Sequence, residues 1–92
     1  MPDDEWVKGE FCVASELGLH ARPAGRFVAL AGRFDCEIEV GRGDEWVNGL
    51  SVLSILSLAA SQGTILQVKA RGEGAERAVA ALGELIESLE DV

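Results

Sequence analysis

Apolar and polar residues alternate along several short stretches of the chain, and such alternation is typical of a β-strand with one buried face. The clearest stretch places Cys36, Ile38 and Val40 between acidic residues. The glycines of the following segment, 41–44, predict a reversal into a returning strand, so we expect this pair to be antiparallel. Four strands are predicted in all, over residues 7–14, 35–40, 45–48 and 64–71.

Three other stretches repeat their apolar residues at the spacing of an amphipathic helix. Pro23 suits the first turn of a helix, so the first helix is expected to begin at about Ala21 and to stop at Gly32. Ser51 is a good N-cap for the second helix. Helices are therefore predicted over residues 21 to about 32, 51 to about 59 or 60, and 75 to about 89.

The predicted order of these elements is β-α-β-β-α-β-α. This order predicts an α+β sandwich, in which a largely antiparallel sheet carries the helices on one face. At 92 residues with 48% hydrophobic content, the chain is long enough for one domain with a modest core. We expect that domain to span residues 1–92, with its core between about residues 7 and 90.

The second predicted helix contains more apolar residues than one buried stripe holds. Its serines recur every third residue and cannot all face an apolar core. Two interpretations remain open: the apolar residues all belong to the core, or some are exposed and form a docking surface. The residues concerned are Leu50, Val52, Leu53, Ile55, Leu56 and Leu58.

The chain has a formal net charge of -8, from 16 acidic and 8 basic residues. This charge argues against a nucleic-acid partner, because phosphates would be repelled over most of the surface. The first five residues contain neither a basic start nor an apolar stretch, so we expect no secretory signal and a cytoplasmic protein. Polar residues and turn signals interrupt the uncharged run 46–68, which favours a helix and a buried strand over a membrane span.

The single histidine, His20, lies between a glycine and the expected start of the first helix. A lone histidine is most often a surface or packing residue, but here a dianion on its ring would lie over backbone N–H groups at the positive end of the helix dipole. Arg22 is close enough in sequence to add a charge-assisted contact. This setting makes His20 a candidate carrier of a phosphoryl group.

The two cysteines, Cys12 and Cys36, are expected to be reduced, because the chain has no export signal. They are far apart in sequence, and together with one histidine they form no recognisable spacing of metal ligands. We therefore expect no metal site.

Two segments of the chain carry a resemblance to a known family. Gly18-Leu19-His20-Ala21-Arg22-Pro23-Ala24 resembles the active-site segment of the HPr family, the phosphocarriers of the bacterial phosphoenolpyruvate:sugar phosphotransferase system. Residues 47–58, with the sequence VNGLSVLSILSL, resemble the family's second signature, which surrounds a regulatory serine. The similarity covers about residues 11–89. It implies an open-faced sandwich with four antiparallel strands and three helices on one face.

The resemblance also implies a function. His20 would accept a phosphoryl group on Nδ1 from phosphorylated enzyme I and pass it to IIA components, while Arg22 and the backbone of Ala21 and Arg22 steady the phosphate. The protein would be a carrier rather than an enzyme, with no cofactor, metal or nucleotide. Ser51 matches the position that an HPr serine kinase/phosphorylase modifies in many members. We expect a monomer whose docking face comprises Ala21, Ala24, Gly25, Arg26, Val52, Leu53 and Leu56.

The chain departs from the family pattern at two positions. Leu17 stands where many members carry Ser or Thr, so a hydroxyl contact to the phosphate from there is absent. Ser54 stands where a basic residue often follows the regulatory serine. Fewer bases would weaken steering toward an acidic enzyme I surface, and Arg22, Arg26 and Arg33 would have to supply it.

Two other functions compete with the phosphocarrier hypothesis. The chain would be a regulatory paralogue, of a nitrogen or carbon-control branch, if it acted mainly by phosphorylation-dependent protein binding. It would be a structural protein if neither His20 nor Ser51 were ever modified.

Overall fold

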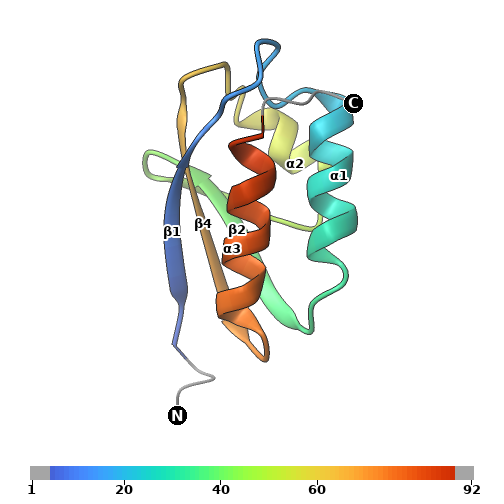
Figure 1. The fold of residues 1–92 in the computed structure, drawn as a ribbon, viewed down its shortest axis with the longest axis vertical. Coiled ribbons are helices and arrows are strands. Elements are labelled where there is room, and N and C mark those ends of the chain that lie inside the picture. The colour runs from blue at the N-terminus through green and yellow to red at the C-terminus, as the bar shows by residue number, and fades with distance from the viewer. Residues whose placement is uncertain (1–4, 89–92) are drawn as a thin grey trace.

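The structure is a computed structural model and describes residues 5–88 of the chain (Figure 1). The predicted order β-α-β-β-α-β-α is confirmed. The strands are β1 (Val7–Cys12), β2 (Cys36–Arg42), β3 (Glu45–Asn48) and β4 (Ile65–Gly72). The helices are α1 (Ala21–Ala31), α2 (Val52–Ser57) and α3 (Ala75–Ile86).

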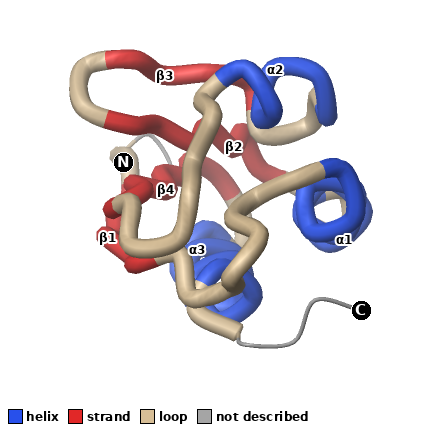
Figure 2. The backbone as a smooth tube through the Cα atoms, turned by 90° about the horizontal axis from the view of Figure 1, so that it is seen from above, coloured by secondary structure: helices blue, strands red, loops and turns tan. Residues whose placement is uncertain are grey.

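The strands form one sheet in the order β1-β4-β2-β3, and every neighbouring pair is antiparallel. The helices lie on one face of this sheet (Figure 2), which confirms the predicted sandwich. Side chains alternate between the two faces along each strand. Leu66, Val68 and Ala70 of β4 therefore lie on the helix side, where all three are completely buried.

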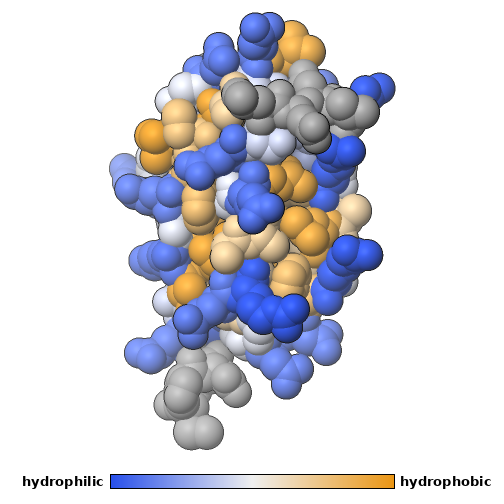
Figure 3. Space-filling model, viewed as in Figure 1, coloured by the Kyte–Doolittle hydropathy of each residue, from blue (hydrophilic) through white to orange (hydrophobic). Residues whose placement is uncertain are grey.

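The core lies between the sheet and the helices. Phe27 of α1, Ile55 of α2 and Leu82 of α3 are each 0% exposed, as the apolar faces of the predicted helices require. On the outer side of α1 and α3, hydrophilic side chains surround smaller apolar areas (Figure 3). None of the helices described within residues 5–88 combines the length and the apolar character that a membrane crossing requires.

The second helix was predicted to run to about residue 59 or 60, but it ends at Ser57. Ala59 has a left-handed backbone conformation with φ of 51°, which a continuing helix does not allow. The Arg42 guanidinium, at the end of β2, donates hydrogen bonds to the carbonyls of Leu58 at 2.9 Å and Ala59 at 3.0 Å. A cation at the carboxyl end of α2 thus takes the carbonyls that further helical turns would have used.

Several predicted boundaries differ by a few residues. β1 ends at Cys12 rather than near residue 14. β2 continues to Arg42, so Gly43 and Asp44 alone form the loop of the hairpin, with Gly43 at φ of 62°. The predicted end of the last helix at Leu89 lies outside the described residues.

On the face of the sheet opposite the helices, two cations of β4 contact two tryptophans. The Lys69 ammonium lies 4.7 Å from the centre of the Trp6 ring and 4.2 Å from that of Trp46. It also lies 3.4 Å from a carboxylate oxygen of Glu39. The Arg71 guanidinium lies 4.4 Å from the Trp6 ring. Cation–π contacts therefore connect the start of β1 with β4 and β3 across this open face.

Two glycines accept the ring of Phe11 between β1 and α3. A Cβ atom at Gly83 of α3 would lie 2.1 Å from Phe11 Cε1, and one at Gly9 of β1 would lie 2.7 Å from Phe11 Cζ. Carbon atoms in contact are separated by about 3.5–4.0 Å. The absence of a side chain at both positions lets the helix approach the edge strand.

Candidate functional site

His20 is the residue immediately before α1, as the position of Pro23 predicted. Its backbone is extended, with φ of -85° and ψ of -167°, and its carbonyl accepts the Ala24 N–H at 3.0 Å. The His20 side chain is half-buried and does not cap the helix. Leu19 anchors it from the preceding position, since that side chain is only 6% exposed and its N–H donates to the Ala60 carbonyl at 2.8 Å.

The first turn of α1 offers two backbone donors to an anion beside His20. The N–H groups of Ala21 and Arg22 have no partner within the helix. Pro23 has no N–H, and the N–H of Ala24 is used by the His20 carbonyl. The first turn contains no acidic residue, so no side chain there neutralises the positive end of the helix dipole. An anion on the His20 ring would meet both donors and this partial charge.

A tight turn leads the chain into His20. The Gly18 N–H donates to the Ser15 carbonyl at 3.0 Å, and Gly18 has φ of 74°. A Cβ at Gly18 would lie 2.5 Å from the Ala60 carbonyl oxygen, so the turn packs directly on the loop that precedes β4. The Gln62 side chain donates to the Ala14 carbonyl at 3.1 Å. Only glycine satisfies both the positive φ and the close approach at position 18.

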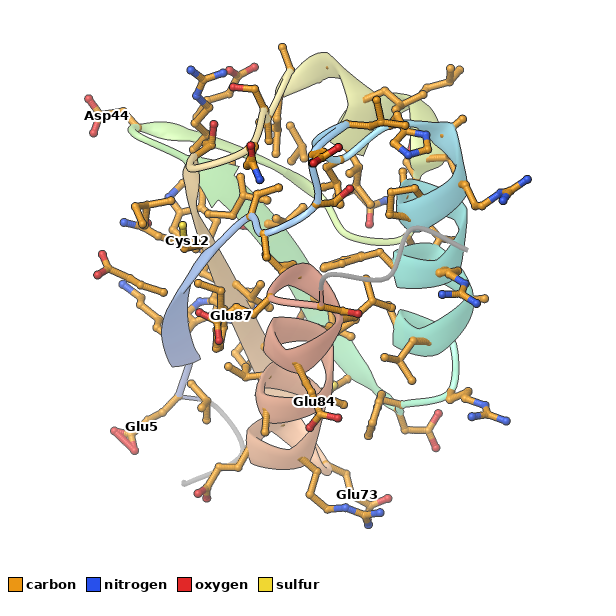
Figure 4. All side chains as sticks on the ribbon, turned by 45° about the horizontal axis from the view of Figure 1, so that its top comes forward. Glu5, Cys12, Asp44, Glu73, Glu84 and Glu87 are labelled. Carbon is orange, nitrogen blue, oxygen red and sulfur yellow. The ribbon has the colours of Figure 1, made fainter. Side chains whose placement is uncertain are left out.

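Three arginines lie in and just after α1, and Arg26 lines the same hollow as the acidic Glu84 and Glu87 at the end of α3. Arg22, Arg26 and Arg33 are exposed. Within residues 5–88, the ion pairs lie on the open face of the sheet, and none involves these three arginines. Glu5 and Glu73 lie at the end of the molecule opposite to the start of α1 (Figure 4). Arg22 and Arg26, in the first two turns of α1, are thus cations near His20 that make no ion pair within residues 5–88, whereas Arg33 follows the opposite end of the helix.

Ser51 caps α2 as predicted. Its hydroxyl oxygen accepts the Ser54 N–H at 3.2 Å, and its carbonyl accepts the Ile55 N–H at 3.1 Å. Asn48 shapes the turn before it, because its side-chain oxygen accepts the Leu50 N–H at 2.9 Å. Ser51 is half-buried. Since α1 packs against α2, the cap lies on the same side of the sheet as His20.

The described residues contain no cluster that suits a metal ion. Within residues 5–88, no three His, Cys, Asp or Glu side chains come together in a group able to hold one. Cys12 is exposed and Cys36 half-buried, and both are free thiols. Burial, and then the nearby charge of Asp35, raise the pKa of the Cys36 thiol.

The comparisons with known proteins cover nearly all of the described residues. The family description "PTS HPr component phosphorylation site" matches residues 7–88, which include both His20 and Ser51. The chain belongs to the HPr family. Members of this family are phosphocarriers of the phosphotransferase system and not catalysts.

Individual members of the HPr family match most of the chain. It is 45% identical over 78 residues to a phosphocarrier protein HPr from Pseudomonas aeruginosa, covering 84% of this chain and 87% of that protein. The crystal structure of HPr from Bacillus anthracis superposes with a TM-score of 0.85 at 34% identity, covering 90% of this chain and 99% of that one. A crystal structure of an HPr dimer from Thermoanaerobacter tengcongensis matches with a TM-score of 0.69 at 44% identity, over 76% and 80% of the two chains.

The structure separates the residues predicted for HPr-type docking into surface and core. Leu53 is 80% exposed, Ala21 and Arg26 are exposed, and Gly25 has open space where a Cβ would lie. Ala24 is completely buried, so its side chain packs in the core and does not reach the surface. The apolar residues of the second segment divide in the same way. Val52 and Leu56 are half-buried, Leu50 is 48% exposed, and Ile55 and Leu58 belong to the core.

Two residues near this surface were missed by the sequence argument. Arg42, the last residue of β2, determines where α2 ends, and no local sequence pattern indicates such a contact between separate elements. The family pattern singles out Leu17 only by the hydroxyl that it lacks, but its side chain is 70% exposed in the turn before His20. A large apolar residue between Glu16 and Gly18, in a segment of turn residues, was the available signal.

Proposed function

We propose that this HPr-family chain accepts a phosphoryl group on Nδ1 of His20 from phosphorylated enzyme I and transfers it to a IIA component. The observation that carries the proposal is the position of His20 immediately before α1, with the N–H groups of Ala21 and Arg22 unpaired within the helix and no acidic residue in the first turn. Such a helix start stabilises a phosphate on the neighbouring ring.

The transfer exchanges one phosphorus–nitrogen bond for another. The lone pair of Nδ1 attacks the phosphorus of the donor's phosphohistidine, and the bond from phosphorus to the donor nitrogen breaks in line. The donor imidazole keeps the released electron pair, so neither water nor an oxidant takes part. Transfer to a IIA component repeats the same exchange, with His20 as the leaving group. The role of this chain is to hold and present the group, which agrees with a carrier that has no cofactor.

The charge distribution supports an acidic protein partner for this exchange. Arg22 and Arg26 are exposed beside His20, whereas the chain as a whole carries a charge of -8. Local cations of this kind orient an approaching acidic surface toward His20 and raise the association rate at low salt. We place the reaction in the cytoplasm, where phosphoenolpyruvate is available to enzyme I, and we propose that the chain acts as a monomer.

The test is phosphorylation by the cognate enzyme I with phosphoenolpyruvate, followed by intact-protein mass spectrometry. The full chain should gain one acid-labile phosphoryl group, His20→Gln should gain none, and Ser51→Ala should gain it normally. Addition of a cognate IIA component should then discharge the wild-type protein. Absence of an acid-labile, His20-dependent phosphate would overturn the proposed function.

We also propose that phosphorylation of Ser51 by an HPr serine kinase/phosphorylase regulates the carrier. Its oxygen already accepts the Ser54 N–H, so a phosphate there keeps a donor at the helix start. The added charge of about -2 would lie next in sequence to Val52 and Leu53 and would oppose the approach of an acidic partner. The serine kinase should therefore slow subsequent transfer to His20 in the wild type and leave the rate for Ser51→Ala unchanged. An equal rate for Ser51-phosphorylated and unmodified protein would contradict this regulation.

A further inference from the structure

Within residues 5–88 the large exposed apolar side chains are Leu17, Leu50, Leu53 and Ile65, exposed by 70%, 48%, 80% and 51%. Of these, Leu17 and Leu53 belong to elements at the end of the molecule that carries His20. Leu17 lies in the loop before His20, and Leu50 and Leu53 lie just before and within α2. The β1–α1 loop, α2 and the start of α1 share one end of the fold (Figures 1 and 2). Ile65 lies on β4 at an alternate position to the buried Leu66, and so on the open face of the sheet.

Leu17 is held in place by its neighbours although its own side chain is open to solvent. It occupies the turn closed by the Gly18 N–H and the Ser15 carbonyl, and Ser15 is only 6% exposed. The Leu19 N–H and the Gln62 side chain fasten both ends of this turn to the loop before β4. An apolar side chain on a fixed backbone loses little freedom when a partner covers it, which is typical of an anchor residue.

We infer that Leu17 is a specificity-determining residue: it inserts into an apolar pocket, bordered by carboxylates, on the proteins that exchange phosphoryl groups with His20. This inference rests on the proposed function. Leu17 is only three residues from His20, and direct transfer between two proteins requires the partner to contact the surface around the reacting nitrogen. Leu17, which lacks the hydroxyl that many family members carry at this position, thus supplies an apolar contact instead.

The surface chemistry of the partner protein follows from the charges near His20 and from the need for direct phosphoryl transfer. The partner must carry its own phosphoryl-bearing or phosphoryl-accepting residue within reach of His20. It must complement Arg22 and Arg26, which make no ion pair within residues 5–88, so its rim is acidic. Between the reacting residue and that rim it must cover Leu17, which an apolar pocket does at the lowest desolvation cost.

The test compares two phosphoryl donors on three proteins. The proteins are the wild-type full chain, Leu17→Ala, and Ile65→Ala as a matched control that truncates an exposed apolar residue on the open face of the sheet. The donors are phosphorylated cognate enzyme I and phosphoramidate, a small donor that needs no docking surface. Thermal unfolding of each variant establishes that the exposed truncations leave the fold intact.

With enzyme I, Leu17→Ala should raise the apparent KM about 5- to 30-fold, because the variant loses the burial of most of one leucine side chain in the complex. The maximal rate should be unchanged. Ile65→Ala should match the wild type with enzyme I, and all three proteins should react equally with phosphoramidate. The role of Leu17 would be overturned by an unchanged KM for Leu17→Ala with enzyme I, or by an equal loss of reactivity of this variant with both donors. Either result would leave the carrier function standing. Failure of both donors to phosphorylate wild-type His20 would instead overturn the proposed function.

Discussion

Gly25 and Gly83 are both interior residues of helices, yet the structure predicts opposite effects when each is replaced by alanine. Alanine is favoured over glycine in a helix interior by about 1 kcal/mol. At Gly25 of α1 an added Cβ has nothing within 4 Å, so Gly25→Ala should stabilise the protein by up to about 1 kcal/mol. At Gly83 of α3 the same atom would lie 2.1 Å from the Phe11 ring.

The magnitude at Gly83 follows from the confinement of that ring. The Phe11 ring cannot move toward β1, because its Cζ already lies only 2.7 Å from the point where a Cβ of Gly9 would be. Overpacking of this kind costs typically about 1–3 kcal/mol, and the blocked ring favours the upper half of that range. After the gain of about 1 kcal/mol in helix propensity, Gly83→Ala should lose about 1–2 kcal/mol. The two variants should therefore differ by about 2–3 kcal/mol.

Urea unfolding monitored by tryptophan fluorescence measures both free energies, and thermal unfolding gives an independent comparison. A loss of 1 kcal/mol lowers the Tm of a domain of this size by about 4–8 °C. In a Phe11→Leu background, the penalty for Gly83→Ala should fall by more than half, because the ring that causes it is gone. If Gly83→Ala stabilised the wild type as much as Gly25→Ala does, the packing argument would be refuted.

Four further predictions concern three other residues. Lys69→Met keeps the aliphatic stem but removes the charge between the two indole rings, so it should lower the free energy of unfolding by about 1–2 kcal/mol in the same urea assay. Because burial and Asp35 raise the pKa of Cys36, this thiol should react with iodoacetamide more slowly than the exposed Cys12 at pH 8, as peptide mapping would show. The stability associated with the protonated Cys36 should be present below its ordinary pKa of 9.0 and decline as pH rises through the higher folded value. Ser51→Ala removes the cap of α2 and should cost about 1 kcal/mol, whereas Ser51→Asp keeps an acceptor and should cost less.

The order of the elements and the start of α1 were predictable because they depend on local properties. Alternation along Cys36, Ile38 and Val40 fixes which face of the sheet they occupy, and the restricted backbone of Pro23 marks the first helical turn. His20 was therefore placed before α1 without the fold being known. The choice of Ser51 as a cap rested on the same kind of local chemistry.

The features that the sequence did not reveal depend on contacts between distant segments. The end of α2 is determined by the Arg42 guanidinium, 16 residues before Leu58. Ala24 belongs to the apolar face of α1, but its sequence position beside the motif suggested a docking role, and its burial excludes its side chain from one. The exposure of Leu17 depends on how its turn packs against the loop before β4. Local spacing contains none of this information.

Pro23 also bears on how tightly a phosphoryl group is held. Any other residue at that position would present a third backbone N–H close to the first two. A hydrogen bond to a charged group contributes about 1.5–3 kcal/mol, so a third donor would shift the equilibrium of the proposed transfer toward retention on His20 by about 10- to 150-fold. A phosphocarrier must release its phosphoryl group to the acceptor about as readily as it receives the group from the donor. In the proposed transfer, the missing donor at Pro23 would keep the phosphorylated state nearer to that balance.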